Sequence, residues 1–144
     1  MSQSYSLRVE TEASPADIQL IHQGLGAYNR QFAQDTDFRP VHIFARNRAG
    51  EIVGGLLGNL YWGWLAVDIL WVDETLRHQG LGSALLAKAE DEARQAGIFR
   101  VHLDTTGFQA LPFYQKHGYT VWGQLDNFVD GHARYYLKKE LQHS

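Results

Sequence analysis

A short stretch in the middle of the chain combines glycines with polar residues, in the order Arg77-His78-Gln79-Gly80-Leu81-Gly82-Ser83. The pattern that follows predicts a helix, and the first turn of a helix offers unpaired amide donors and the positive end of a dipole. Both favour an anion such as phosphate. Gly80 and Gly82 would let an anion approach the backbone, and Arg77 and Ser83 add a cation and a hydroxyl. These residues alone support a phosphate site and a simple helix-starting turn equally.

Two other phosphate-binding loops fit this stretch less well. A Walker A loop requires Gly-Lys-Ser/Thr after its last glycine, whereas Gly82 is followed by Ser83-Ala84. A dinucleotide fingerprint requires a third glycine where Leu85 stands. The stretch therefore matches neither of these nucleotide-binding motifs.

The elements around the turn alternate between strand and helix. In chain order we expect a strand over 4–11, a helix opened by Ser14-Pro15, a hairpin of strands 42–46 and 51–57, a strand over 64–72, a helix over 80–97, a strand over 99–105, a helix over 110–117, and closing strands over 119–125 and 134–139. The strand over 64–72 is mostly apolar on both faces, so it is predicted to be interior, with Leu65, Val67, Ile69 and Trp71 on one face and Ala66, Asp68, Leu70 and Val72 on the other. This order predicts an α/β fold with a mixed sheet, in which residues 64–105 form a right-handed parallel crossover.

Composition narrows the class of protein. The 144 residues are 44% apolar and 20% charged, which predicts one globular domain over 1–144. A formal net charge of −3 disfavours nucleic acid as a partner, because binding to phosphate backbones favours a basic excess. Cysteine is absent and the seven histidines lack metal-binding spacing, so disulfides, thiolate chemistry and a metal are not expected. Without a signal peptide or an apolar run of roughly 20 residues, a soluble cytoplasmic protein that contacts no membrane is expected.

The flanks of the glycine turn resemble a known family. Residues 70–86 carry Val72, Asp73-Glu74, Arg77-x-x-Gly80-x-Gly82 and Leu85-Leu86, and this pattern resembles motif A of the GNAT superfamily of acyl-CoA N-acyltransferases. Residues 110–119 read Ala-x-x-Phe-Tyr-x-Lys-x-Gly-Tyr and resemble its motif B. The two motifs lie one helix and one strand apart, as in the family. The resemblance covers roughly residues 4–140 and implies a central mixed sheet flanked by helices.

The resemblance also implies an activity, which is transfer of acetyl from acetyl-CoA to the primary amine of a small molecule by direct attack in a ternary complex. The pyrophosphate of CoA would bind the amides of residues 79–83, which are Gln79, Gly80, Leu81, Gly82 and Ser83, with Arg77 and His78 adjacent. The pantetheine arm would pair with the backbone of Leu70, Trp71 and Val72, in a splay between strands 64–72 and 99–105.

Acetyl transfer to an amine requires proton transfers as well as binding. Tyr114 occupies the general-acid position of the family, and the alternative is an aromatic residue packed on the sheet. Asp68 is a carboxylate on an otherwise apolar strand, expected to be either the general base or a buried structural anion paired with an arginine. A backbone amide near Val72 would stabilise the oxyanion. Glu74 is expected in a solvated turn.

The sequence departs from the family at Gly107, where many members carry an asparagine that contacts the cofactor arm. Thr105, Thr106 or Gln109 would supply a polar group there instead, and the choice among them stays open.

The acceptor site is the least defined part. A cluster of Tyr61, Trp62 and Trp64, with Tyr28 and Phe32 on the first helix, is expected either in the core, on a homodimer surface or in an acceptor pocket; Asp35, Asp37 and His132 are weaker candidates for acceptor contacts. Three alternatives remain: a protein N-terminal or lysine acetyltransferase, a catalytically silent acyl-CoA-binding module, and a binder of another phosphate ligand.

Overall fold

The computed structural model describes residues 4–33 and 38–143. Contacts divide the chain into two compact units, residues 1–36 and 37–144, and each unit is described by itself. The single domain over 1–144 stays a prediction. In the part of the chain that is described, no helix combines the length and the apolar character that crossing a membrane demands.

The first unit contains helix α1 (Pro15–Asn29), which begins where the sequence predicts. The Ser14 hydroxyl accepts a hydrogen bond from the Asp17 amide at 3.1 Å, so Ser14 caps the helix and Pro15 occupies its first turn. The strand predicted over 4–11 is wrong, because residues 5–10 form no regular structure and Leu7 and Val9 are about 90% exposed. Alternating apolar residues do not make a strand unless its backbone pairs with a neighbour.

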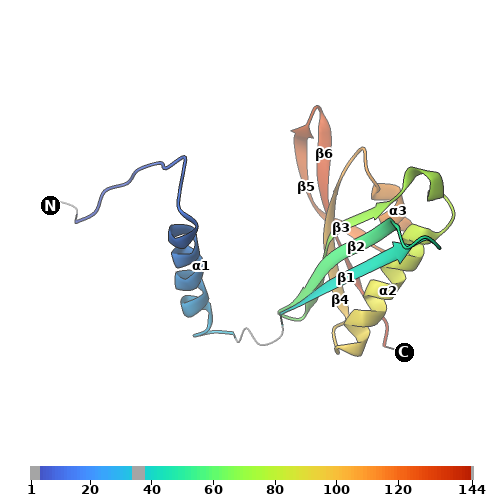
Figure 1. Ribbon diagram of the computed structural model, residues 1–144, viewed down its shortest axis with the longest axis horizontal. Coiled ribbons are helices and arrows are strands. Elements are labelled where there is room, and N and C mark those ends of the chain that lie inside the picture. Colours follow the sequence, from blue (N-terminus) through green and yellow to red (C-terminus); the bar gives the residue numbers. More distant parts are fainter. Residues whose placement is uncertain (1–3, 34–37, 144) are drawn as a thin grey trace. The chain divides into compact units, whose positions relative to one another are not determined.

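The second unit is built on a six-stranded mixed sheet, which confirms the predicted fold class (Figure 1). Its strands are β1 (Arg39–Arg46), β2 (Ile52–Tyr61), β3 (Trp64–Val72), β4 (Arg100–Thr106), β5 (Thr120–Val129) and β6 (His132–Glu140). They lie side by side in the order β1-β2-β3-β4-β6-β5. The β3–β4 pair is parallel and the others are antiparallel, so β3 is the interior strand that its sequence predicts.

Helix α2 (Leu81–Gln95) forms the core of this unit together with the sheet. It packs on β1, β2 and β3, and its apolar stripe of Leu85, Leu86, Ala89 and Ala93 faces inward. Gly97 follows the helix with a φ of 76°, as expected for the residue that ends it. The short helices η1 (Glu74–Leu76) and α3 (Leu111–Lys116) precede α2 and follow β4, respectively.

A buried carboxylate lies inside this core. The Glu90 side chain on α2 is only 8% exposed, and its carboxylate accepts hydrogen bonds from the Tyr119 hydroxyl at 2.7 Å and from Lys139 Nζ at 3.1 Å. Burial raises the pKa of Tyr119 well above its ordinary value, and the nearby Glu90 charge raises it further. This trio ties α2 to the end of the second motif and to β6.

A β-bulge interrupts β3 and changes which residues share a face. Val67 and Ile69 pair with Gly58 and Leu57, which are adjacent on β2, so Asp68 is an extra residue without a partner. The side chains of Leu65 and Val67 face the core, but after the bulge Leu70 faces it and Ile69 is 55% exposed. The strict alternation predicted along 64–72 is therefore wrong beyond Asp68, because the extra residue shifts the side-chain period by one.

Candidate active site

The parallel strands β3 and β4 separate at the bulge. Their pairing covers only the stretch from Leu65 opposite Val101 to Val67 opposite Leu103. Beyond it β3 continues to Val72 and β4 to Thr106 without pairing to each other. The opening leads into a cleft of about 1020 Å³, lined by β3, the turn before α2, the end of β4 and α3. The structure thus contains the predicted splay, and both sequence motifs contribute to its walls.

The unpaired edge of β3 forms one side of this cleft. Leu70, Trp71 and Val72 all line it, and on their other side these residues pair with β2. The side chains of Leu70 and Val72 pack on the core, whereas Trp71 is 46% exposed. Because no strand of the described chain occupies the open side, an extended ligand could form backbone hydrogen bonds there as an additional strand would.

The glycine turn at the start of α2 forms the end of the cleft. Gly80 is the N-cap residue with a φ of 85°, and His78 also has a positive φ of 65°. No side chain caps this helix, unlike α1 and η1, whose first turns are capped by Ser14 and Asp73. The first amides of α2 precede its first intrahelical bond, in which the Ala84 amide donates to the Gly80 carbonyl, so no carbonyl of the helix accepts from them. The helix thus begins with the uncapped donors that an anion requires.

The side chains of the turn are held in different ways. Arg77 Nε donates to the Val72 carbonyl at 3.2 Å, which places its guanidinium between β3 and the turn. Arg77, His78, Gly80, Leu81, Gly82 and Ser83 line the cleft. Gln79 is not among the lining residues; its side-chain amide lies 3.4 Å from the Thr75 carbonyl, so only its backbone would remain for a ligand.

His117 joins the two motifs through a contact with Ser83. Its Nε2 lies 2.8 Å from Ser83 Oγ, and its ring packs against Phe113 at a centroid distance of 4.7 Å. The Ser83 hydroxyl is therefore engaged with the end of α3, while the Ser83 amide belongs to the uncapped first turn. Only the fold brings positions 34 residues apart together, so no local pattern could have identified the pair.

Tyr114 lies on α3 at the wall of the cleft and is 6% exposed. Its ring packs between Phe113 and Tyr119, at centroid distances of 5.2 and 5.8 Å. Burial raises the pKa of Tyr114 to about 12, and the Asp104 charge contributes in the same direction. The phenol consequently stays protonated, and thus a hydrogen-bond donor, throughout the physiological pH range.

Asp68 lies in the bulge and lines the cleft, but it is exposed, so the expectation of a buried carboxylate is wrong. Its Oδ2 lies 3.4 Å from Asn59 Nδ2 and no arginine pairs with it among the described residues. The cleft's other carboxylate, Asp104, is instead bound to Arg134 at 2.8 Å. Asp68 therefore has its lone pairs largely free, whereas Asp104 is engaged in an ion pair.

The remaining candidates occupy varied positions. Glu74 is exposed on η1 outside the cleft, in agreement with a solvated turn. His132 contacts the ring of Phe108, a residue that lines the cleft. Tyr28 and Phe32 contact each other in the first unit at 5.4 Å, and Asp35 and Asp37 lie outside the described residues. Across the described ranges, no three His, Asp or Glu side chains form a group that could hold a metal ion.

Comparison with known proteins agrees with this geometry. Residues 9–119 match the model of the acetyltransferase (GNAT) family. The chain is 41% identical to a blasticidin-S acetyltransferase of Streptomyces morookaense over 72% of its own length and 79% of the relative's. It is 38% identical to the acetyltransferase Atu2258 of Agrobacterium fabrum, over 84% and 88% of the two chains.

Among solved structures, a putative acetyltransferase from Agrobacterium tumefaciens superimposes with a TM-score of 0.88 at 34% identity, over 95% of this chain and 100% of that one. With its fold, its cleft and these relatives, the chain belongs to the GNAT family and is an acetyltransferase. The co-substrate of that family is acetyl-CoA.

Proposed function

We propose that this protein transfers the acetyl group of acetyl-CoA to a primary amine of a small molecule, by direct attack in a ternary complex at the cleft between β3 and β4. One observation carries the proposal: the cleft joins an uncapped helix start, an unpaired strand edge and a protonated phenol in one continuous space. Acetyl-CoA consists of a diphosphate, an extended arm with amide groups and a thioester, one after another. These three features match the three groups in the same order.

The cleft residues would hold the co-substrate along its length. The amides at the start of α2 suit the diphosphate, with Arg77 and His78 beside them. The open edge of β3 suits the pantetheine amides, and this arrangement would bring the thioester toward the bulge. The bound co-substrate supplies an acetyl group activated as a thioester, so the protein has to position the amine, accept its proton and stabilise the charges that develop.

Asp68 suits the task of accepting the proton of the amine. An alkylamine has a pKa of about 10.4, so nearly all of it is protonated at neutral pH and must lose a proton before it can attack. Asp68 is exposed and has only a weak amide contact, so it can receive that proton directly or through a water molecule. The amine then attacks the acetyl carbon, and the oxyanion would be stabilised by a backbone amide near Val72.

Tyr114 suits the task of stabilising the departing thiolate. With its pKa raised to about 12, Tyr114 is a weaker acid than a thiol of pKa about 8.5. Complete proton transfer to the thiolate would thus be uphill by about 5 kcal/mol, at about 1.4 kcal/mol per pKa unit. A hydrogen bond from the phenol to the sulfur as the charge develops requires no such transfer. We therefore assign Tyr114 as the donor to sulfur, with the final proton coming from solvent.

Gln109 is the best replacement for the asparagine missing at Gly107. Its Oε1 accepts from the Thr106 amide at 2.8 Å, which identifies that atom as the oxygen and leaves Nε2 as a donor. The Thr105 hydroxyl is engaged with Gln109 and the Ala110 amide. Because Gln109 lines the cleft, its Nε2 would donate to a carbonyl of the pantetheine arm.

Two measurements test this function. Thermal unfolding with acetyl-CoA, ATP or NAD should show stabilisation by acetyl-CoA, and stronger stabilisation by ATP or NAD would indicate a different ligand. Thiol release with acetyl-CoA should then rise when small primary amines, including blasticidin S, are added. A rate that rises only with peptides bearing a free N-terminus or lysine would assign a protein acceptor. Stabilisation without release for any amine would indicate a silent acyl-CoA-binding module.

A further inference from the structure

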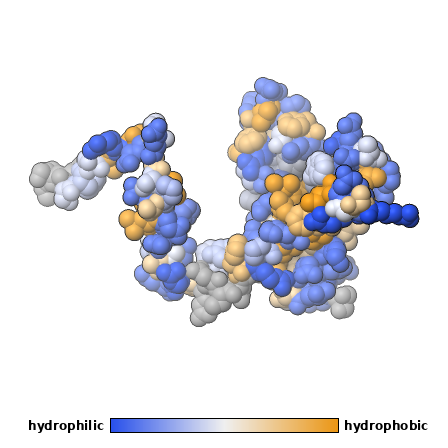
Figure 2. Space-filling model, in the orientation of Figure 1, coloured by the Kyte–Doolittle hydropathy of each residue, from blue (hydrophilic) through white to orange (hydrophobic). Residues whose placement is uncertain are grey.

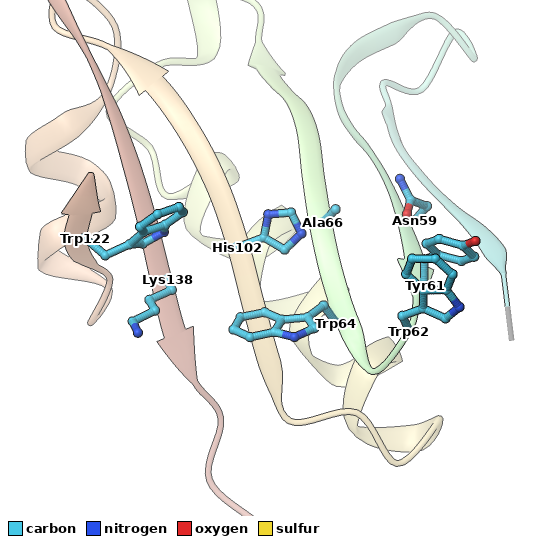
Figure 3. Close-up of a pocket in the computed structure, with 8 residues that line it drawn as sticks. All are labelled: Asn59, Tyr61, Trp62, Trp64, Ala66, His102, Trp122 and Lys138. Atoms are coloured by element: carbon cyan, nitrogen blue, oxygen red, sulfur yellow. The ribbon is translucent and has the colours of Figure 1, made fainter. Parts of the chain in front are cut away.

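A second hollow adjoins the catalytic cleft and has a different composition. It encloses about 610 Å³ on the sheet, a size suited to a small organic molecule. Figure 3 shows its lining, in which four aromatic side chains surround a small polar floor: Asn59, Tyr61, Trp62, Trp64, Ala66, His102, Trp122 and Lys138. Apolar surface is also visible on the sheet-based unit in Figure 2.

The floor of the hollow is one row of residues across four strands. Asn59 pairs with Ala66, Ala66 with His102, and His102 with Lys138, so all four share a register line. At about 4.8 Å per strand, the row is about 14 Å long. Ala66 has the smallest side chain of this row, so the surface is depressed at its position.

Two of the aromatic residues that line the hollow, Trp62 and Trp122, lie where the backbone departs from regular strand geometry. Trp62 lies in the two-residue turn between β2 and β3 with a φ of 51°, where asparagine or glycine is usual. Its ring stacks on Tyr61 at 4.3 Å, which offsets the strain of that backbone conformation. Trp122 is the extra residue of a bulge in β5, since Val121 and Gly123 pair with the adjacent residues Leu137 and Tyr136. Bulges redirect side chains, and this one directs an indole to the hollow.

The hollow and the cleft meet at one hydrogen bond. Asn59 lines the hollow, Asp68 lines the cleft, and Asn59 Nδ2 lies 3.4 Å from Asp68 Oδ2. An acceptor whose amine lies at Asp68 would therefore extend its body over Ala66 and between the aromatic side chains.

The charges around the hollow limit what that body can be. An aromatic enclosure can bind either a cation or a planar ring. Here Lys138 lines the hollow, and the guanidinium of Arg100 already lies 5.1 Å from the Trp64 ring. A further positive charge would be repelled by these two cations, so the enclosure favours a planar ring that is neutral or anionic.

We infer that the acceptor is a molecule that contains a primary amine and a planar conjugated ring, and that the ring is neutral or anionic. The ring binds in this hollow and the amine lies at Asp68. The inference rests on the proposed function and names its substrate class. Asn59 is then a positioning residue that orients Asp68, and the aromatic side chains determine specificity.

The test compares 2-phenylethylamine with 2-cyclohexylethylamine, which share a carbon skeleton but differ in planarity. Because the two amines also differ in basicity, the informative quantity is the ratio of their kcat/KM values and its change between variants. Ala66→Leu fills the floor of the hollow without removing any aromatic residue. It should lower the ratio of kcat/KM for 2-phenylethylamine to kcat/KM for 2-cyclohexylethylamine about tenfold. Ala49→Leu, the same change in an exposed turn, should leave it unaltered.

A binding measurement separates this inference from the proposed function. Adding 2-phenylethylamine should shift the indole N–H resonances of Trp62, Trp64 and Trp122 but not that of Trp71, which lines only the cleft. No thiol release with any amine would overturn the proposed function, and the resonances would then decide whether the hollow binds planar amines. Thiol release with a ratio that Ala66→Leu does not change, or indole resonances that do not shift, would overturn the inference alone.

Discussion

Replacing Asp68 by asparagine isolates the proton-accepting step, because the side chain keeps its shape and loses its basicity. Asp68 is exposed, and among the described residues its side chain has a hydrogen bond only with Asn59, so Asp68→Asn should alter the free energy of unfolding by less than about 0.5 kcal/mol. Loss of a general base lowers the rate by about 10²–10⁴-fold. The variant should therefore be nearly inactive at pH 7 and fully folded.

The deficit should shrink as the pH rises. For an amine of pKa about 10.4, the neutral fraction grows about tenfold per pH unit below that value. Between pH 7 and pH 9 the variant should thus recover about 100-fold in kcat/KM, whereas wild type should change less. Titration of Tyr114 does not contribute to the dependence of kcat/KM on pH, because its pKa of about 12 keeps the phenol protonated between pH 7 and pH 9.

Steady-state thiol release at several pH values, combined with a melting curve, is the assay. Glu74→Gln removes an exposed carboxylate outside the cleft and serves as the matched control, with wild-type activity expected. An Asp68→Asn variant with the wild-type rate and pH profile would refute the assignment and leave a water chain to accept the proton. A large loss of stability would refute the reading of Asp68 as an exposed side chain.

Three further changes test other parts of the account. Tyr114→Phe should lower kcat by about 10²-fold with little change in acetyl-CoA affinity, and unaltered turnover would make Tyr114 a packing residue. Gly82→Asp should abolish stabilisation by acetyl-CoA, which in wild type is about 2.7 kcal/mol at one hundred times the Kd. A side chain at this position would lie against Phe113, and its negative charge in the first turn of α2 would repel the diphosphate; a retained thermal shift would place the diphosphate site elsewhere. Glu90→Gln leaves Lys139 without its counter-charge, and because Lys139 keeps 23% exposure the cost should be about 2 kcal/mol, or about 6 °C in Tm. Its activity per folded molecule should stay at the wild-type level, and an unchanged Tm would show that the buried trio adds no net stability.

Much of the fold followed from local patterns. The cap formed by Ser14-Pro15 and the helix that follows the glycine turn both lie where the sequence predicts. Such signals are local, because capping and helical periodicity depend on a few neighbouring residues.

The predictions that are wrong concern structure that depends on pairing between distant segments of the chain. Alternation over 4–11 predicts a strand but cannot supply a neighbour, and alternation over 64–72 cannot reveal the extra residue at Asp68. The apolar residues around Asp68 predict a buried side chain, yet the bulge and the splay leave it exposed.

The site shows the same division. The glycine turn and Tyr114 could be identified by their place in the two motifs, and both line the cleft. The contact of His117 with Ser83 and the row from Asn59 to Lys138 join residues from separate strands and helices, so neither leaves a pattern in the sequence.

The most direct test of the central claim is thiol release from acetyl-CoA by the wild-type protein, with and without a primary amine, with the acetylated product identified by mass. We predict saturable release that depends on the amine, with one acetylamide formed per thiol released. Release that no amine accelerates, or that yields only free acetate, would contradict it.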